Sequence, residues 1–259
     1  MLLAIDAGNT NIVFALYEGD RLAHSWRCQT IAGRTADEYA AWLYQLFTQA
    51  GLTFAAVKDA VIGSVVPDVN FNLVKLCADT FGCDPLIVSA KNAGIKVNLK
   101  NPDEAGADRL LNAAAAARNY GSPVIVIDFG TATTFDVVNA AGEYCGGAIA
   151  PGPNLSAEAL YQAAAKLPRV GIKKPVCVIG TDTVGAMQSG LYWGYVGLIE
   201  GLLKRTMDEM GVKPRVIATG GLAGIFAEDI PLIEKTDGDL TLRGLLYIYE
   251  SSIKNQKAA

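Results

Sequence analysis

The fold of this chain is decided by Ile5-Asp6-Ala7-Gly8-Asn9-Thr10-Asn11, a stretch that recurs, with changes, as Ile127-Asp128-Phe129-Gly130-Thr131-Ala132-Thr133-Thr134. The aspartates at positions 6 and 128 align the two copies at an offset of 122 residues. Each copy has an apolar segment that ends in Asp, a Gly two positions later, small polar residues, and a second apolar segment. This pattern predicts two strands joined by a tight polar turn, and its repetition predicts two related halves of the molecule.

The bulk composition limits the classes of protein to consider. With 259 residues, 51% of them hydrophobic, the chain can bury the core of one large domain or of two smaller ones. No segment reaches the ~18 consecutive apolar residues of a membrane helix, and the N-terminus lacks the pattern of a secretory signal. The formal charge of −4 disfavours a nucleic-acid partner. The five cysteines include no CxxC pair, which disfavours a disulfide framework and a zinc site. We therefore expect a cytoplasmic protein with no membrane or nucleic-acid partner.

The predicted elements repeat one order along the chain. Strands are expected at residues 2–6, 11–17, 21–29, 60–65, 86–88, 124–128, 135–138, 144–150 and 215–219. Helices are expected at residues 69–81, 108–120, 156–166, 182–210 and 241–254, and one more follows the capping box Thr35-Ala36-Asp37-Glu38. Three strands followed by strands that alternate with helices are typical of a ribonuclease-H-like lobe. We therefore expect an α/β fold with lobes of residues 1–121 and 122–240, the terminal helix at 241–255 packing on the first lobe.

The first polar turn has the chemistry of a phosphate site. Gly8 lets the backbone approach a phosphate oxygen without a Cβ in the way. The next three residues, Asn9, Thr10 and Asn11, supply hydrogen-bond donors, and Asp6 can hold Mg²⁺ directly or through water. The alternative is an ordinary hairpin turn, because Asn, Asp and Gly are common in turns. The second copy of the turn favours the functional interpretation.

A third motif, Val216-Ile217-Ala218-Thr219-Gly220-Gly221, ends a predicted strand with bare backbone, against which adenine and ribose could lie. Taken alone, it could equally be a strand-to-helix turn. In this order, the three motifs resemble the phosphate-1, phosphate-2 and adenosine motifs of the superfamily of acetate and sugar kinases, heat-shock chaperones and actin. The resemblance implies two ribonuclease-H-like lobes of the actin-like ATPase type, with ATP in the cleft between them.

A fourth motif, Gly106-Ala107-Asp108-Arg109, lies near the start of an Ala-rich predicted helix. By itself, an Asp beside an Arg on a helix is usually a surface pair. Together with the two Asp-bearing turns, however, it closely resembles the type III pantothenate kinases, and the likeness runs from Leu2 to about Tyr249. Further matching stretches are Gly146-Gly147-Ala148-Ile149-Ala150-Pro151-Gly152, Gly180-Thr181-Asp182-Thr183 and Ala218-Thr219-Gly220-Gly221.

The resemblance implies phosphorylation of pantothenate at its primary hydroxyl by ATP, the first step of coenzyme A biosynthesis. Asp108 would be the general base, and Arg109 and the helix N-terminus are expected to keep it ionised at neutral pH. Arg109 would meet the substrate carboxylate, and the implied pantothenate site comprises Gly106, Ala107, Asp108, Arg109 and Thr183. The implied ATP site comprises Asp6, Ala7, Gly8, Asn9, Thr10, Asn11, Ile12, Val13, Thr131, Gly220 and Gly221. Asp128 would bind K⁺ or NH₄⁺, and Asp6 would hold Mg²⁺ through water.

This sequence departs from the family at one position near the implied pantothenate site. The family often has a Tyr shortly before Asn-Pro in the pantothenate pocket, whereas this chain has Leu99 at the apparent position, so the hydroxyl contact is not expected. The resemblance also implies a homodimer, since members of the family form dimers in which the partner subunit completes part of the substrate site. The glycine-spaced helix at residues 182–210 could form that interface, or it could be buried within its own subunit.

Two other functions are compatible with parts of the sequence. One is a kinase or phosphohydrolase of the same superfamily that acts on another hydroxyl or on polyphosphate, against which the Gly-x-Asp-Arg motif argues. The other is a nucleotide-binding regulatory protein. Pantothenate-dependent release of ADP would support the kinase, whereas ATP binding without such release would support the regulatory protein.

Overall fold

The computed structural model describes residues 1–164 and 166–258, with side chains described as far as Lys254. The chain forms two compact units. Unit 1 consists of Met1–Ile95, Lys100–Ala115 and the segment from Thr241 onward, and unit 2 consists of Lys96–Leu99 and Ala116–Leu240. Each unit is built on its own mixed β-sheet.

The sheet of unit 1 has five strands in the order β3-β2-β1-β4-β5. The strands are β1 (Leu2–Ala7), β2 (Asn11–Glu18), β3 (Arg21–Gln29), β4 (Asp59–Ser64) and β5 (Leu86–Ile87). The first three strands are antiparallel, while β4 runs parallel to β1 and β5 parallel to β4. The predicted hairpin around residues 8–11 is therefore confirmed.

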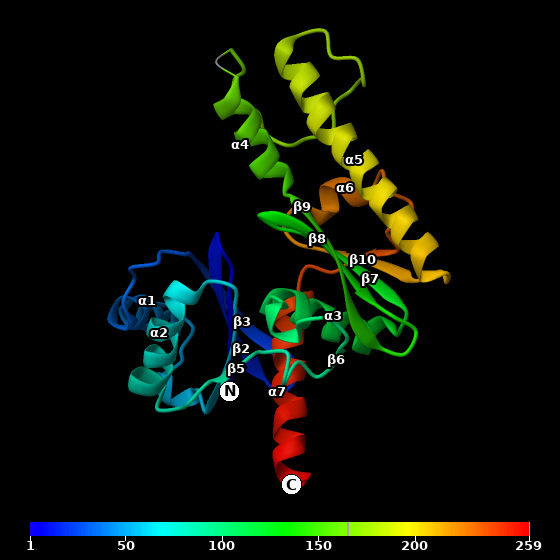
Figure 1. Ribbon diagram of the computed structural model, residues 1–259. Helices are drawn as coiled ribbons and strands as arrows, with labels where there is room; N and C mark the ends of the chain where they lie inside the picture. Colours follow the sequence, from blue (N-terminus) through cyan, green and yellow to red (C-terminus); the bar gives the residue numbers. More distant parts are fainter. Residues whose placement is uncertain (165, 259) are drawn as a thin grey trace. The chain divides into compact units, whose positions relative to one another are not determined.

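Helices cover both faces of this sheet, as Figure 1 shows. On one face Ile5 and neighbouring strand residues pack against α1 (Ala36–Gln49) and α2 (Pro67–Leu76), and on the other face Ala4 and its neighbours pack against α3 (Ala107–Tyr120) and α7 (Leu240–Ala258). Because both faces are buried, β1 is apolar at nearly every position rather than at alternate ones. The predicted capping box at the start of α1 is present, with Thr35 and Glu38 bonded reciprocally.

The sheet of unit 2 has six strands in the order β11-β10-β7-β8-β9-β6. They are β6 (Lys96–Val97), β7 (Val124–Phe129), β8 (Ala132–Val138), β9 (Glu143–Pro151), β10 (Arg215–Thr219) and β11 (Lys235–Thr236). Apart from β6 at one edge, this order and the strand directions repeat those of unit 1. The predicted duplication is thus confirmed at the level of sheet topology.

The core of unit 2 lies between this sheet and α5 (Thr183–Met210), with α6 (Ala223–Ala227) beside it. Ile125, Ile127 and Phe135 face Tyr192 and Ile199 of α5. The remaining helix of the unit is α4 (Pro153–Ala163), and two 3₁₀ turns lie at Phe54–Ala56 and Pro102–Glu104. None of the described helices is both long and apolar enough to cross a membrane.

Two predicted helices differ in detail from the structure. The helix expected at residues 69–81 is α2, which ends at Leu76 and continues as a π-helical turn, Cys77–Phe81, before Gly82 at φ +67°. The helix expected at residues 156–166 is α4, which starts earlier because Pro153 takes its first turn, where a missing N–H is tolerated. It ends at Ala163, and Ala165 lies outside the described residues.

Candidate functional site

The first polar turn, loop 1 (residues 8–11), joins β1 to β2. The Gly8 amide donates a hydrogen bond of 3.0 Å to the Asn11 carbonyl. Asn9 and Thr10 are exposed at the tip, while Asp6, near the end of β1, is half-buried. Loop 1 therefore presents polar groups and one carboxylate at one end of the unit 1 sheet.

Loop 1 is supported from behind by Thr30, the residue that follows β3. The Thr30 amide donates a hydrogen bond of 3.0 Å to the Thr10 carbonyl, and the Thr30 hydroxyl donates one of 2.6 Å to the Gly8 carbonyl. No local pattern singles out Thr30, because it lies 22 residues from Gly8 and beyond the end of a strand. Only the pairing of β2 with β3 brings it to the loop.

Asp108 lies in the first turn of α3. Its Oδ1 accepts a hydrogen bond of 2.7 Å from the backbone amide of Arg109. A Cβ on Gly106 would lie only 2.6 Å from the same oxygen, so glycine at this position leaves room for the carboxylate. The geometry gives a physical reason for the spacing Gly-x-Asp-Arg.

The pKa of Asp108 is raised above its ordinary value. Burial of the carboxyl group is the largest cause, and the amide and the positive charge of Arg109 act against it. Arg109 and the helix N-terminus thus act in the direction that the sequence predicts, but burial, which the sequence did not reveal, outweighs them. A carboxylate with a raised pKa is the stronger proton acceptor as long as it is ionised at the working pH.

The start of α3 lies close to loop 1 within unit 1. Val65, which follows β4, donates a backbone hydrogen bond of 3.0 Å to the carbonyl of Ala7, the last residue before loop 1. A Cβ on Gly106 would lie 3.5 Å from Cγ1 of the same Val65. The structure therefore brings the Gly-x-Asp-Arg motif and loop 1 to the same end of one sheet.

The second polar turn, loop 2 (residues 130–132), joins β7 to β8. The Gly130 amide donates a hydrogen bond of 3.1 Å to the Ala132 carbonyl, and the Gly152 amide donates one of 3.0 Å to the Thr131 carbonyl. Thr131 is exposed at the tip, and Asp128, on β7, is half-buried. Loop 2 is one residue shorter than loop 1 but has the same position in its sheet.

The Thr-Gly-Gly motif packs directly on the base of loop 2. Strand β10 pairs with β7, so that Thr219 lies beside Asp128. Gly220 follows at φ +88°, and a Cβ there would lie 2.6 Å from Oδ1 of Asp128 and 2.7 Å from the backbone of Phe129. Glycine is required both by the backbone angle and by this close approach. Unit 2 thus brings together Asp128, Thr131 and the Gly220-Gly221 turn.

Thr183 lies elsewhere in unit 2. It is the exposed first residue of α5, after the N-cap Asp182, which accepts a hydrogen bond of 2.8 Å from the Gly185 amide. Tyr195 of α5 lies near loop 2, because its hydroxyl donates to the carbonyl of Pro151, which pairs with Ala132 of the loop. Since a helix rises ~1.5 Å per residue, Thr183 lies about 18 Å along α5 from Tyr195. The structure does not bring Thr183 to loop 2 of its own chain.

The cation candidates, Asp6 and Asp128, lie one in each unit. Among the described residues, no three His, Cys, Asp or Glu side chains gather to hold a metal ion. Asp6 and Asp128 each offer a carboxylate one residue before the end of a strand, β1 and β7 respectively. Mg²⁺ is often held by only one or two carboxylates together with phosphate oxygens, so such a donor set fits a cation that arrives with a nucleotide.

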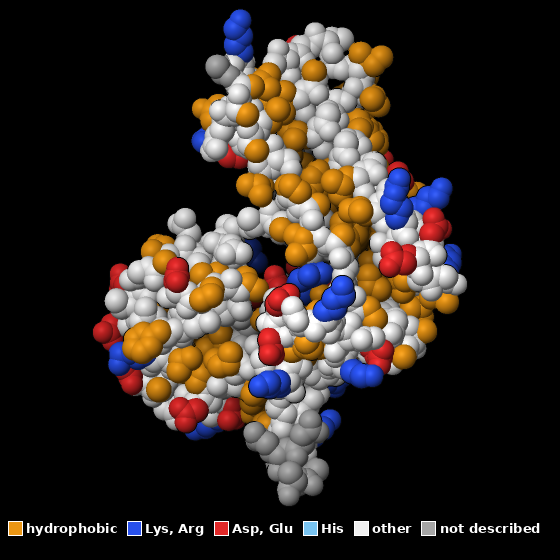
Figure 2. All heavy atoms as spheres, in the orientation of Figure 1, with side chains coloured by type: hydrophobic (Ala, Val, Ile, Leu, Met, Phe, Trp, Pro, Cys, Tyr) orange, Lys and Arg blue, Asp and Glu red, His pale blue; other side chains and the backbone are white. Residues whose placement is uncertain are grey.

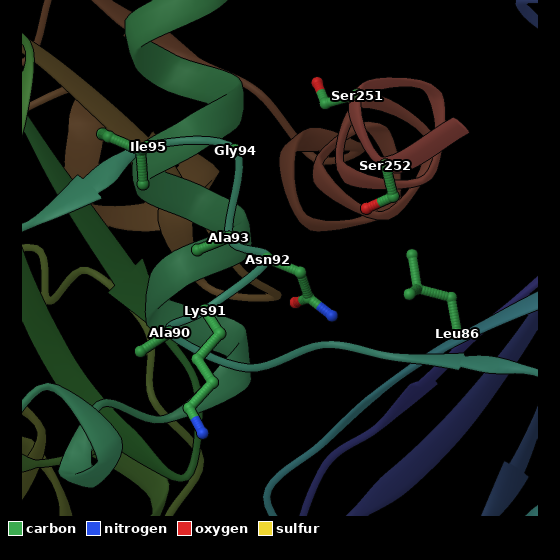
Figure 3. A pocket seen from close by; sticks show the side chains of 9 residues that line it. All are labelled: Leu86, Ala90, Lys91, Asn92, Ala93, Gly94, Ile95, Ser251 and Ser252. Carbon is green, nitrogen blue, oxygen red and sulfur yellow. The ribbon is translucent and has the colours of Figure 1, made fainter. Parts of the chain in front are cut away.

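A pocket of about 440 Å³ lies apart from these motifs (Figure 3). It is formed within unit 1 by the segment at residues 90–95, Leu86, and Ser251 and Ser252 of α7. None of the predicted site residues lines it.

Comparison with known proteins identifies the family. Residues 2–205 match the type III pantothenate kinase family. A type III pantothenate kinase of Paramagnetospirillum magneticum is 59% identical over 251 residues, which is 96% of each chain. Another, of Rhodospirillum rubrum, is 58% identical over 251 residues, which is 96% of this chain and 98% of the relative.

The chain belongs to the type III pantothenate kinase family. It is therefore an ATP-dependent kinase that phosphorylates pantothenate in coenzyme A biosynthesis, as the resemblance in the motifs predicted.

Solved structures share the fold of this type III pantothenate kinase. A Baf family protein from Campylobacter jejuni has a TM-score of 0.63 at 16% identity, covering 97% of this chain and 99% of its own. An inorganic polyphosphate/ATP-glucomannokinase from Arthrobacter sp. strain KM has a TM-score of 0.51 at 14% identity, covering 98% of both chains. Similarity at such low identity concerns the fold alone, and it confirms the expected α/β fold of the actin-like ATPases with two mixed sheets.

Sequence reasoning missed residues of the kinase that support the loops. Gly152 ends a stretch that matches the family, but no role was predicted for it. Tyr195 could not be found from local pattern, because its contact with Pro151 spans 44 residues and an aromatic residue on an apolar helix face is normally just core.

Proposed function

We propose that Asp108 is the general base that accepts the proton of the primary hydroxyl of pantothenate. The hydroxyl oxygen forms a bond to the γ-phosphorus of ATP while the bond from that phosphorus to the β,γ-bridging oxygen breaks, so that 4′-phosphopantothenate and ADP leave. The proton stays on Asp108 until solvent removes it. The observation that carries this proposal is the half-buried Asp108 carboxylate, which the Arg109 amide holds at the start of α3.

ATP is bound by both polar turns in this proposal. Loop 1 with its flanking residues, 6–13, binds the phosphates through backbone amides and the side chains of Asn9, Thr10 and Asn11. Thr131 contacts the same nucleotide, and Gly220-Gly221 provides a flat backbone surface for adenosine. Loop 1 belongs to the proposed lobe of residues 1–121, with the helix at 241–255, and loop 2 to the lobe of residues 122–240. The common position of the two loops in duplicated sheets supports this assignment.

The proposal includes two kinds of cation. Asp6 holds Mg²⁺ through water, and the Asp128 carboxylate binds K⁺ or NH₄⁺. Bound cations neutralise charge on the phosphates of ATP. In support, each carboxylate is half-buried at the end of a strand, and Gly220 keeps the space beside Oδ1 of Asp128 clear of a side chain.

Pantothenate lies against Gly106, Ala107 and Arg109 in the proposal, with the Arg109 guanidinium binding the substrate carboxylate. Leu99 lies where the family often has Tyr, and it packs against Gly146, on which a Cβ would lie 3.0 Å from Cδ2 of Leu99. An apolar contact replaces the hydroxyl contact at this position.

The proposal also includes a homodimer formed through α5. Gly190, Gly194 and Gly197 share one exposed face of α5, and a Cβ on any of them would meet no atom within 4 Å beyond the adjacent residues and the local helix backbone. The buried residues of α5 lie on its opposite face, so the glycine face is open to a close approach by a second copy. Thr183, exposed and remote from loop 2 in its own chain, would then serve the site of the partner.

Apolar side chains next to this face support the same assembly. Figure 2 shows hydrophobic side chains gathered over α4 and the N-terminal half of α5. The exposed apolar residues of this region are Ile149, Leu155, Leu160, Tyr161, Val176, Val178, Ile179 and Val184. Extended exposed apolar patches mark interaction surfaces. All five cysteines are free thiols, which supports a reducing, cytoplasmic location for the enzyme.

An ADP-release assay tests the catalytic proposal. The purified chain is supplied with Mg²⁺-ATP in K⁺ buffer, with and without pantothenate, and ADP is measured by a coupled reaction. We expect ADP only when pantothenate is present. ATP binding without pantothenate-dependent ADP would contradict the proposal and would instead favour a regulatory protein.

A further inference from the structure

The two polar turns are supported by residues at equivalent positions, Thr30 behind loop 1 and Gly152 behind loop 2. In unit 1, β3 pairs with β2 as far as Gln29 opposite Asn11, and the next residue is Thr30. In unit 2, β9 pairs with β8 as far as Pro151 opposite Ala132, and the next residue is Gly152. Each of these two residues donates its backbone amide to the carbonyl of the threonine in its loop, at 3.0 Å in both cases.

We propose that Thr30 and Gly152 are positioning residues that hold loop 1 and loop 2 in the conformation that binds the phosphates of ATP. The proposal rests on the proposed function of the two loops as the phosphate-binding turns. It assigns to Thr30 and Gly152 no contact with substrate.

The hydrogen bonds of Thr30 fix which way the peptides of loop 1 face. The Thr30 hydroxyl binds the Gly8 carbonyl and the Thr30 amide binds the Thr10 carbonyl, so both carbonyl groups point toward Thr30. In a trans peptide the C=O and the following N–H point in opposite directions. The amides of Asn9 and Asn11 therefore point away from Thr30, to the side on which a phosphate can accept from them.

In unit 2, the backbone of Gly152 itself lies against the carbonyl groups of loop 2, and no side-chain hydroxyl takes part. A Cβ on Gly152 would lie 2.3 Å from the Thr131 carbonyl oxygen and 2.5 Å from that of Gly130, so only glycine fits behind loop 2. The φ of Gly152 is −70°, which any residue can adopt, so the need for glycine comes from crowding alone. Tyr195 fixes the neighbouring Pro151 through its carbonyl and lies 3.1 Å from the buried Thr133 hydroxyl.

The test compares Thr30→Val, which keeps the shape of the side chain but removes the hydroxyl, with Thr30→Ser, which keeps the hydroxyl. The dissociation constant of Mg²⁺-ATP is measured by calorimetry, and KM for ATP and for pantothenate are measured separately. We expect Thr30→Val to weaken ATP binding by roughly tenfold, the usual effect of one lost hydrogen bond, with KM for pantothenate unchanged. Thr30→Ser should restore wild-type binding.

The matched control is Thr48→Val, which removes a hydroxyl that donates to the Tyr44 carbonyl on α1. It should leave ATP binding unchanged. Gly152→Ala should weaken ATP binding like Thr30→Val, whereas Gly171→Ala, where a Cβ meets nothing within 4 Å, should not. If Thr30→Val lowers the melting temperature but binds ATP as the wild type does, the role of Thr30 is structural only and the proposal is overturned.

Hydrogen exchange separates this proposal from the proposed function. In the nucleotide-free protein, Thr30→Val should speed the exchange of the amides of loop 1 and leave those of loop 2 unchanged, whether or not the enzyme turns over. Wild-type protein that binds ATP but releases no ADP with pantothenate would refute the catalytic proposal alone. Unchanged exchange and unchanged ATP binding in Thr30→Val would refute the positioning role alone.

Discussion

Asp108 is placed where two physical effects oppose each other. Burial raises its pKa, while the amide and the charge of Arg109 lower it. A group with this balance can be ionised at neutral pH and still accept a proton readily when the substrate hydroxyl becomes acidic in the transition state. The expected role of Asp108 can therefore be tested through both turnover and pH.

Asp108→Asn removes the proton acceptor and keeps the shape of the side chain. We expect kcat to fall by about 10² to 10⁴, the usual contribution of a general base, while the dissociation constant of pantothenate changes little. Steady-state kinetics and calorimetry measure the two quantities. The exposed Asp103→Asn is the control, and full activity in Asp108→Asn would show that another group takes the proton.

The raised pKa of Asp108 has a consequence for pH dependence. Activity should decline on the acid side with a midpoint above 3.8, the ordinary pKa of Asp, because only the ionised carboxylate acts as base. A carboxyl group whose pKa is higher in the folded than in the unfolded chain is destabilising when ionised, and this cost is absent below the unfolded pKa. At pH 7, Asp108→Asn should therefore melt no lower than the wild type; a lower melting temperature would contradict this account of its surroundings.

Asp128 offers a separate test of the cation proposal. Asp128→Ala should lose most of the stimulation of activity by K⁺ or NH₄⁺, because its carboxylate is the proposed ligand. Initial rates in K⁺, NH₄⁺ and Na⁺ buffers at equal ionic strength measure this stimulation. Wild-type activity that is already as high in Na⁺ as in K⁺ would refute the assignment.

Among the elements, the ones with strong local signals were predicted correctly. The Thr35–Glu38 capping box identifies α1, and the two polar turns that follow Asp6 and Asp128 identify their hairpins. Helix α5 and strand β10 agree with the sequence prediction within one residue. Each of these signals is carried by residues that are close together in the chain.

The elements that were missed depend on distant partners. Strand β6 is Lys96–Val97, which forms only because β9 lies beside it, and β11 is a similarly short partner of β10. The break of α2 into a π-helical turn at Cys77 is not visible in the local pattern, which predicted one helix over residues 69–81. The same holds for the site, where Gly-x-Asp-Arg was visible in sequence but the support of loop 1 by Thr30 was not.

The packing of α7 on α3 gives a test at the level of helices. A Cβ on Gly244 of α7 would lie 2.4 Å from the Leu111 carbonyl of α3, so these two helices approach closely through the glycine. Gly244→Ala should reduce the free energy of unfolding by about 1–3 kcal/mol, the usual cost of overpacking. Urea unfolding measures the change, with Gly238→Ala, where a Cβ meets nothing within 4 Å, as control. No loss of stability in Gly244→Ala would contradict the close packing.

The whole molecule repeats one architecture in two units. The strand order 3-2-1-4-5 of unit 1 matches 9-8-7-10-11 in unit 2, and each unit carries its polar turn between the same two strands. Unit 2 adds β6, and its α5 carries the open glycine face. In the proposed function, the two turns bind one nucleotide and the glycine face of α5 receives a second copy.

The proposed dimer can be tested by blocking that surface. Gly194→Leu adds a side chain on the exposed face, where an added Cβ meets no neighbouring element within 4 Å. Leu is also a better helix former than Gly by about 1 kcal/mol. In analytical ultracentrifugation the wild type should sediment as a dimer of the 27.3 kDa chain, and the variant as a monomer. Gly238→Leu should remain dimeric. A variant Gly194→Leu that is as dimeric as the wild type would place the interface elsewhere.

The most direct measurement of the central claim is calorimetric titration with Mg²⁺ and a non-hydrolysable ATP analogue. Because both polar turns bind the same nucleotide in this account, we predict that each chain binds one analogue. Asp6→Asn and Asp128→Asn should each weaken this binding at least roughly tenfold. The control Asp68→Asn, at an exposed position, should leave it unchanged. Two analogues per chain, or wild-type affinity after a change in either turn, would contradict it.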